Sequence, residues 1–492
     1  MSSIPDAPQR CPWALAIVFG KLLLHLFTIG LYDFHRDEIY LLVCGRHLGW
    51  GSPDHAPLAP ALSWLLGHLP NQSVAASLTG QRVVAALAGT ATVWWTARLT
   101  RRLGGNRNAQ RVAAASALIA PALLFQSGVY TTGTLDALCW IAACDLTAAA
   151  MRSHRAPSWL LAGGALGLGL LAKYTAVLCG AGLAIGLCAS SEREQLRRSG
   201  PWLALGVAVV VVLPNLLWQA THALPALRFA VGSHASIVLR FSRLEVLAVQ
   251  PMIMHPFSFV VTVIGLATAL RLQGVERVFG ILFLFTLAIV VVVPGKPHYV
   301  MPAYLPLIAI GARSVAAWLE RRSKATRVAL TAGWFASGAV AFLLTVPVLP
   351  LPTLLHLRVD RINSEVVQFA DWRAVAAEVR RAQSSVGRPL PVLTDSYGTA
   401  AAIELYGPPL LPPWSGANSF YLRLPTYDPN ELIAAGYPEP LLDALCGRRT
   451  AVGKIVSPSG LDNRYDFPRT IWLCTDLRSS LRAFWPRLRR FD

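Results

Sequence analysis

The chain has 492 residues, of which 54% are hydrophobic and only 14% are charged. Soluble proteins carry about 25% charged residues, so this composition excludes an ordinary soluble enzyme. The formal net charge of +18 comes from basic residues in short loops between apolar segments. That distribution is the positive-inside pattern of a membrane protein, not a nucleic-acid-binding surface. We therefore expect a polytopic membrane protein in contact with lipid and with no nucleic-acid partner.

Apolar runs of roughly 20 residues, long enough to cross a bilayer, recur through the first 350 residues. We predict eleven spans, at 13–33, 78–100, 112–130, 134–151, 157–171, 173–189, 201–217, 246–270, 277–294, 299–318 and 327–347. No small-residue cleavage site follows the first span, so we expect it to be retained rather than removed as a signal peptide. Residues 157–189 could instead form one long helix, which would invert the orientation of everything after it.

The loops assign the two sides of the membrane. Five basic loops fall on the same side, at 101–111, 152–155, 192–198, 271–277 and 320–327. The positive-inside rule makes that side the cytoplasm of a bacterial inner membrane. The opening segment, the "GKPHY" turn (295–299) and everything beyond residue 348 then face outward. Polar residues gather at these outward turns, which suggests one shared outward-facing cavity.

The first outward segment contains "HRDEIYLLVCGRHLGW" (35–50), which predicts a short helix lying in the membrane interface. Asp37 and Glu38 fall in its first turn. Their simplest role is to cap the helix, because its dipole favours acids there. A carboxylate beside a cavity can also act as a general base. His55, further along the segment, is more often a solvated loop histidine than a metal ligand.

Five stretches in this order resemble bacterial glycosyltransferase family 39, a branch of the GT-C superfamily that also holds protein O-mannosyltransferases and lipid A aminoarabinose transferases. They are "YDFHRDEIYLLVCGRHLGWGSPDHAPLAP" (32–60), "LGLGLLAKYTAVL" (166–178), "LPNLLWQATHALPAL" (213–227), "VVPGKPHYVMPAYLPLIAIGA" (292–312), and "SYGTAAAIELYG" (396–407) with "SGANSFYL" (415–422). The resemblance covers nearly the whole chain and implies the GT-C fold.

The resemblance also implies a chemistry. A polyprenyl phosphate sugar is the donor, an acid of the first outward loop is the base, and the acceptor hydroxyl displaces the phosphate with inversion. Asp37 matches the first acid of the family's Asp-Glu motif, with Glu38 orienting it or the acceptor. Donor phosphate contacts are then expected from Lys173, Tyr174, Lys296, Tyr299 and Arg36, and the site is lined by His35, His55, Asp136 and His298. Without the resemblance, the two lysines would be read as snorkelling to the interface, and Tyr299 as an aromatic-belt residue.

Two departures from the family pattern fall among the expected donor contacts in this loop and not at the base. Where the aminoarabinose transferases have Lys-Pro-Pro, this chain reads "HAPL" (55–58), so His55 replaces a permanent cation. Those relatives also have an Arg where this chain has Tyr40. The sugar and the acceptor (lipid, glycan or protein) stay open. No metal-ligand spacing is evident, and a divalent cation remains an open requirement.

Residues 1–350 are thus predicted to form the transmembrane catalytic domain, in which the outward loop at 34–77 carries the acidic motif, and residues 351–492 a small outward α/β domain. "DWRAVAAEVRRAQSS" (371–385) predicts an amphipathic helix. Cys446 and Cys474 lie in this tail, where an oxidising compartment permits a disulfide between them, although the sequence cannot supply its geometry.

Two other functions fit a polytopic chain. A transporter or lipid flippase would also have many spans, but its ionisable groups are expected near mid-depth within broken helices. Here the acids gather at the outer ends. A non-catalytic scaffold that presents the tail domain would tolerate loss of Asp37.

Overall fold

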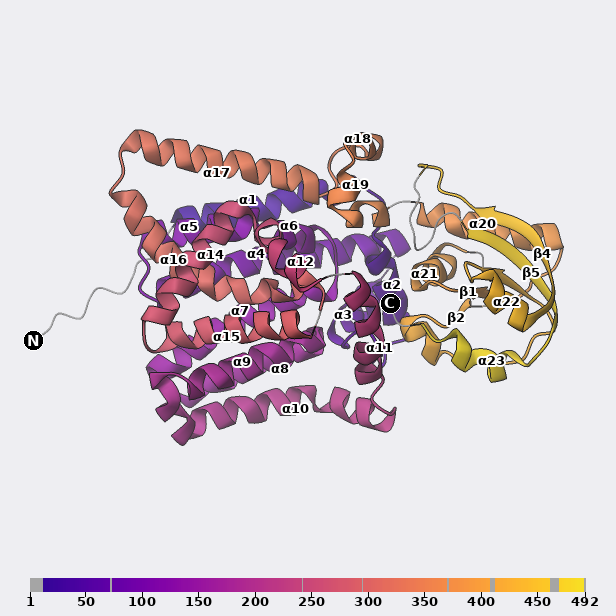
Figure 1. Cartoon of the computed structure of the whole chain (residues 1–492), viewed down its shortest axis with the longest axis horizontal. Coiled ribbons are helices and arrows are strands. Elements are labelled where there is room, and N and C mark those ends of the chain that lie inside the picture. Colours follow the sequence, from indigo (N-terminus) through magenta and orange to yellow (C-terminus); the bar gives the residue numbers. More distant parts are fainter. Residues whose placement is uncertain are drawn as a thin grey trace, which may run out of the picture.

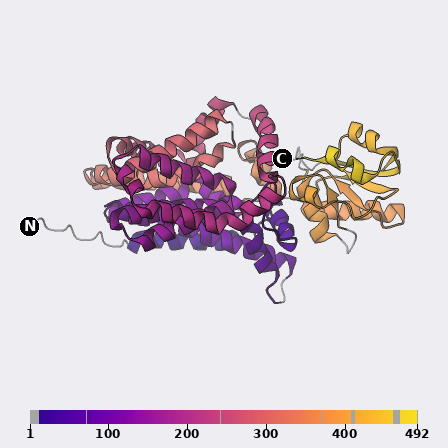
Figure 2. The ribbon, with the colours of Figure 1, turned by 90° about the horizontal axis from the view of Figure 1, so that it is seen from below.

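The computed structural model describes residues 12–70, 73–240, 242–293, 295–369, 371–407, 412–460 and 469–490, and for 233–240 the backbone alone. A helical bundle forms one end of the molecule and a smaller domain with a sheet caps the other (Figure 1). The view turned by 90° shows the same two-part shape, with the capping domain beyond one end of the bundle helices (Figure 2).

Each of the eleven predicted spans coincides with helical structure. The helices are α1 (Pro12–Thr28), α4 (Val74–Arg102), α5 (Arg107–Ile119) with α6 (Pro121–Gly128), α7 (Thr132–Ser153), α8 (Ala156–Ala172), η1 (Tyr174–Ala176) with α9 (Val177–Cys188), α10 (Ser199–Thr221), α12 (Arg243–Ala248) with α13 (Gln250–Met254) and α14 (Pro256–Arg271), α15 (Val275–Val292), η3 (Pro297–Val300) with α16 (Met301–Glu320), and α17 (Lys324–Thr345). Within the described ranges, five helices have the length and apolar composition to cross a membrane, or eight if each of three bent helix pairs is one span. The protein is a multi-pass membrane protein.

Two of the bends occur at prolines. The axis turns by 66° between α5 and α6 and by 110° at the start of α14. Pro121 and Pro256 stand at those breaks as the first residues of the following helices. Proline disfavours helical geometry in the residue before it and cannot donate the helical hydrogen bond. The sequence prediction placed one continuous span over each break.

Residues 157–189 form two helices and not one long helix. Lys173 separates them with extended backbone angles (φ −157°, ψ 133°). Helix α8 packs against α7 and α10, whereas α9 packs against α15. The break therefore places Lys173 at the end of two helices that belong to different layers of the bundle.

The first outward segment folds into α2 (Arg36–Arg46) and α3 (Leu58–Gly67). The prediction that α2 lies in the membrane interface is wrong, because eight of its eleven residues are buried. It packs between α3, α4 and helix α21 (Tyr397–Tyr406) of the capping domain. Helix α2 is thus the structural joint between the two parts of the molecule (Figure 1).

The chain leaves the bundle through α18 (Leu351–His356), α19 (Val359–Ile362) and η4 (Ser364–Phe369). The capping domain then contains α20 (Trp372–Val386), β1 (Val392–Thr394), α21, β2 (Trp414–Ser415), η5 (Asn418–Leu422), β3 (Leu432–Ala435), α22 (Glu439–Leu445), β4 (Cys446–Ile455), β5 (Arg469–Leu477) and α23 (Leu481–Leu488). The amphipathic helix predicted at 371–385 is confirmed as α20. An additional helix, α11 (Pro225–Arg240), follows α10 in the outward loop.

The capping domain is built on one five-stranded sheet with the strand order β2-β1-β3-β5-β4. Strand β1 pairs in parallel with β2 and β3, and β5 pairs antiparallel with β3 and β4. A disulfide joins Cys446 to Cys474 across β4 and β5, with the Cα atoms 5.3 Å apart. The pairing that the sequence left open is therefore present, and it holds the sheet edge farthest from β2.

Candidate functional site

The start of α2 places the two acids of the predicted motif in different environments. His35 caps the helix, because its Nδ1 accepts a hydrogen bond from the backbone N–H of Asp37 at 3.1 Å. In return, Glu38 Oε2 accepts from the backbone N–H of His35 at 2.7 Å. This reciprocal pair is a capping box. The capping interpretation therefore holds for Glu38, whereas the Asp37 side chain takes no part in the cap.

Glu38 is fully buried and paired with Arg82 of α4, which is also buried. Arg82 Nε lies 2.9 Å from Glu38 Oε1, and Arg82 Nη2 lies 2.9 Å from Oε2. The same guanidinium donates to the backbone carbonyls of Ile29, Tyr32 and Asp33. Glu38 has no surface for a substrate, and its contacts fix where α2 begins. The buried pair thus holds the start of the helix that carries Asp37.

Asp37 is the acid of the pair that reaches solvent, with 36% of its side chain exposed. The hydroxyl of Tyr397, from α21 of the capping domain, donates to Asp37 Oδ1 at 3.1 Å. Arg36 Nε lies 3.8 Å from the same oxygen. The exposed carboxylate is therefore held from both parts of the molecule.

Glu365 of η4 brings the linker between the two parts into this site. Its carboxylate accepts from His35 Nε2 at 3.2 Å, and 46% of its side chain is exposed. Partial burial alone would raise the pKa of Glu365, but the hydrogen bond from His35 and the charges of Arg36 and Lys296 lower it to about 2. Glu365 is thus ionised at neutral pH. No motif marks this residue in the sequence.

The predicted phosphate-binding cations lie around the same end of the bundle. Lys173, at the break between α8 and η1, places Nζ 4.5 Å from the centre of the Tyr299 ring. Lys173 and Lys296 both interact electrostatically with His298. Lys173 also interacts with Asp136, which is 3% exposed in α7.

These interactions form one continuous group. Lys296 and Arg36 both act on Glu365, so the cluster around Lys173 continues through Lys296 to the start of α2. The structure thus brings together Arg36, Lys173 and Lys296 from three separate segments. We call these three side chains the cation group. Together with the carboxylate of Asp37, they can hold an anionic ligand next to a proton acceptor.

Tyr174 has a different environment from the one predicted. Its hydroxyl lies 3.1 Å from the carbonyl oxygen of His55 and accepts a hydrogen bond from Gln219 Nε2 at 2.9 Å. Asn215 Nδ2 lies 3.3 Å from the same hydroxyl. These bonds tie the loop before α3 to the end of α10. The Tyr174 hydroxyl is therefore already used in holding the loop.

His55 lies buried beneath this loop, with its ring edge-to-face against Tyr40. Burial, the largest single effect, lowers the pKa of His55, but the Asp54 carboxylate, Cys44 and the backbone carbonyl of Ala56 together raise it to about 9. His55 is therefore positively charged at neutral pH.

The comparisons with known proteins can now be set beside this geometry. The family model for dolichyl-phosphate-mannose-protein mannosyltransferase matches residues 54–218. None of the curated proteins matches the sequence. The structure is similar to ArnT from Cupriavidus metallidurans in the apo state, with 14% sequence identity and a TM-score of 0.64, over 94% of this chain and 98% of ArnT. ArnT bound to undecaprenyl phosphate gives the same coverage and identity, with a TM-score of 0.63.

A third similar structure is the arabinofuranosyltransferase AftD from Mycobacteria, with 14% identity and a TM-score of 0.53. That match covers 94% of this chain and 42% of AftD. The chain has the GT-C glycosyltransferase fold. These matches confirm the fold that the resemblance in the sequence implied, and the region shared with ArnT covers 94% of this chain.

Within this GT-C fold, Tyr40 makes a contact that sequence analysis did not anticipate. Its hydroxyl lies 2.8 Å from Asp54 Oδ2 and 2.7 Å from Ser419 Oγ, and it accepts from the Ser419 backbone N–H at 3.0 Å. Ser419 belongs to η5 of the capping domain. Burial, together with the nearby Asp54, raises the pKa of Tyr40 well above its usual value. Its hydroxyl therefore stays neutral and holds the GT-C bundle against the capping domain.

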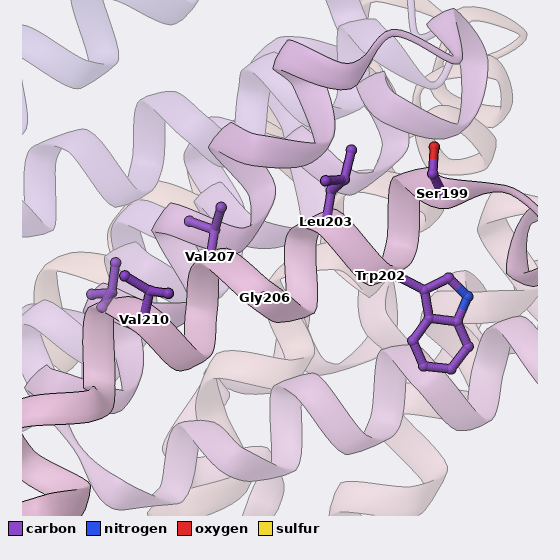
Figure 3. A pocket seen from close by; sticks show the side chains of 7 residues that line it. Ser199, Trp202, Leu203, Gly206, Val207 and Val210 are labelled. Atoms are coloured by element: carbon purple, nitrogen blue, oxygen red, sulfur yellow. The ribbon is translucent and has the colours of Figure 1, made fainter.

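Two other features of this GT-C chain lie outside the cluster. Within the described ranges, no group of three or more His, Cys, Asp or Glu side chains could hold a metal ion. An apolar groove runs along the first half of α10, lined by Trp202, Leu203, Val207 and Val210 (Figure 3). Only 22% of the apolar stretch of α10 is buried inside the protein. Asn215 and Gln219 lie near the other end of this helix. The groove lies on an exposed apolar face of α10, and none of its lining residues belongs to the candidate site.

Proposed function

We propose that the protein is a membrane glycosyltransferase that moves a monosaccharide from a polyprenyl phosphate to an acceptor on the extracytoplasmic side, with inversion at the anomeric carbon. Asp37 is the general base. The observation that carries the proposal is the partly exposed Asp37 carboxylate beside Arg36, at the end of the bundle where Lys296 acts on Glu365 and Lys173 acts on His298. Such a combination suits a reaction in which a proton leaves the acceptor while negative charge develops on a phosphate.

The balanced step is as follows. The acceptor hydroxyl attacks the anomeric carbon and loses its proton to Asp37, and the new glycosidic bond forms as the bond from that carbon to the donor phosphate oxygen breaks. The polyprenyl phosphate leaves as a phosphate monoester with one more negative charge. The cation group stabilises that charge where it develops, which lowers the barrier of the chemical step itself. The acid formed on Asp37 then returns its proton to water.

The similar proteins support the donor class. ArnT has been solved with undecaprenyl phosphate, and it matches this chain along nearly its full length. The matching family model is described by a dolichyl phosphate mannose donor. Both ligands are polyprenyl phosphates with or without a sugar, so we assign that class to this chain. The acceptor is a lipid, a glycan or a protein.

The basic loops and the disulfide support the orientation. The five basic loops lie on the side of the bundle away from the cation group, which the positive-inside rule assigns to the cytoplasm. A disulfide between Cys446 and Cys474 suits an oxidising compartment. We therefore place the site and the capping domain on the periplasmic side of a bacterial inner membrane.

A transfer assay tests the proposal. Purified protein receives a panel of radiolabelled polyprenyl phosphate sugars with membrane extract, and wild type is compared with Asp37→Asn. General-base catalysis contributes roughly 10²–10⁴-fold to a rate, so we expect Asp37→Asn to lose label transfer by about that factor with an unchanged melting temperature. Wild-type protein that consumes no donor, or an Asp37→Asn variant as active as wild type, would contradict the proposal.

A further inference from the structure

The capping domain contributes one polar side chain directly to Asp37. Tyr397 is the first residue of α21, immediately after the turn that follows β1. Ser396 caps this helix, with its Oγ accepting from the Gly398 backbone N–H at 3.2 Å. A capped helix start held by a buried strand gives Tyr397 a fixed place in the domain. Its hydroxyl reaches across the domain boundary to Asp37 Oδ1 at 3.1 Å.

The ring of Tyr397 is fixed as firmly as its hydroxyl. The Arg36 guanidinium lies over the ring, 4.8 Å from its centre. The Tyr40 ring lies 4.6 Å away on the bundle side. The next residue, Gly398, approaches so closely that a Cβ there would be 2.8 Å from Arg36 side-chain atoms. The boundary between the two domains is therefore packed without spare space around Tyr397.

A partly exposed aspartate needs such support in order to act as a base. The terminal torsion of an aspartate is broad, so its two oxygens exchange places readily unless a contact holds them. General-base catalysis requires the accepting oxygen within about 2.6–3.2 Å of the proton that it removes. Among the described residues, Asp37 Oδ2 accepts no hydrogen bond, whereas Oδ1 accepts from Tyr397. The contact therefore distinguishes the two oxygens.

We propose that Tyr397 is a positioning residue that holds Asp37 Oδ1, so that Oδ2 faces the acceptor hydroxyl. This inference rests on the function proposed above, because it assigns Asp37 as the base. The capping domain thereby becomes part of the catalytic unit: undocking it withdraws the Tyr397 hydroxyl from the base, although every donor-binding cation stays on the bundle.

The test uses the full-length protein and the transfer assay. Tyr397→Phe removes the hydroxyl and keeps the ring that Arg36 and Tyr40 contact. A hydrogen bond to a charged group is worth about 1.5–3 kcal/mol, so we expect kcat to fall roughly tenfold or more, with the KM for the donor unchanged. The matched control is Tyr406→Phe at the other end of α21, because the Tyr406 hydroxyl has no hydrogen-bond partner among the residues that the structure describes. We expect Tyr406→Phe to keep the wild-type kcat.

A double-variant comparison separates positioning from general packing. If Tyr397 acts through Asp37, adding Tyr397→Phe to Asp37→Asn causes no further loss of the residual single-turnover rate. Equal kcat in wild type and Tyr397→Phe, a fall in kcat that adds fully to that of Asp37→Asn, or a rise in the KM for the donor alone would each overturn the inference. Active wild-type enzyme with any of these results contradicts only the role of Tyr397. Wild-type enzyme without transfer contradicts the proposed function, and this inference with it.

Discussion

At the scale of single residues, two neighbouring acids of the same motif have opposite environments. The Glu38 side chain is fully buried with Arg82, whereas 36% of the Asp37 side chain is exposed. A helix turns by about 100° per residue, so Glu38 faces the protein interior while the adjacent Asp37 is partly exposed to solvent. The motif thus combines a structural acid with a candidate base, and their substitutions should separate folding from activity.

Glu38→Gln is expected to destabilise the protein. The substitution leaves the buried Arg82 guanidinium without its counter-ion, and breaking a buried pair in this way costs about 3–5 kcal/mol. The measurement is the melting temperature of the purified protein in detergent, which should fall. The matched control is Asp37→Asn, whose melting temperature should equal that of wild type. If Glu38→Gln has the same melting temperature as wild type, the hydrogen bonds from Arg82 to the carbonyls of Ile29, Tyr32 and Asp33 are enough to stabilise its charge.

At the scale of elements, hydropathy was enough to find the apolar helices but not the breaks within them. Every predicted span coincides with a helix because bilayer crossing demands long apolar segments whose backbone bonds close internally. The 66° bend before Pro121 and the burial of α2 depend on neighbouring helices, which no local pattern contains. Tyr397 and Glu365 were missed for the same reason, since each acts on α2 from more than 300 positions away. Asp37 and the lysines were found because a family resemblance marked them.

The break between α8 and η1 is consistent with the phosphate-binding role predicted for Lys173. Because the chain is extended there, the ammonium group can lie beside Tyr299 instead of on a lipid-facing helix surface. Lys173→Met is expected to weaken binding of a polyprenyl phosphate by about tenfold or more, since a hydrogen bond to a charged group is worth roughly 1.5–3 kcal/mol. Melting temperature should change little, because the methionine keeps the apolar stem.

Binding is measured with a radiolabelled polyprenyl phosphate that lacks the sugar, so the result does not depend on turnover. Lys324→Met, at the first position of α17 and on the side of the basic loops, is the control cation. Equal losses in both variants would indicate a general effect of membrane charge, and no loss in Lys173→Met would return this lysine to simple snorkelling at the interface.

At the scale of the whole molecule, the two domains meet through polar contacts that converge on α2. Asp37 bonds Tyr397, Tyr40 bonds Ser419, and His47 at the end of the helix lies 2.8 Å from Glu404. Glu365 in the linker adds the contact to His35. The helix that carries the candidate base therefore also forms the interface with the capping domain. A change that weakens this interface should also disturb the position of Asp37.

Glu365 makes the stability of this interface depend on pH. Its pKa is lowered from an ordinary value of 4.5 to about 2 by His35 and the nearby cations. A carboxylate with a lowered pKa in the folded state stabilises the fold at a pH above its ordinary value, and the contribution disappears as the pH falls towards the folded value. The stabilising effect of Glu365 is therefore complete above about pH 5 and is lost progressively between about pH 4.5 and pH 2.

The measurement compares the melting temperatures of wild type and Glu365→Gln in detergent at pH 6, 4.5 and 3. We expect wild type to have the higher melting temperature at pH 6, and the difference between the two melting temperatures to shrink as the pH falls. Protonation removes the charge of Glu365 from wild type, and the Gln variant lacks that charge at every pH. The control is Glu439→Gln, because Glu439 is an acid of the capping domain with 62% of its side chain exposed. Its melting temperature should differ little from that of wild type, and the difference should vary little with pH. A Glu365→Gln difference that stays constant or widens towards pH 3 would mean that the contact between Glu365 and His35 does not stabilise the joint between linker and α2.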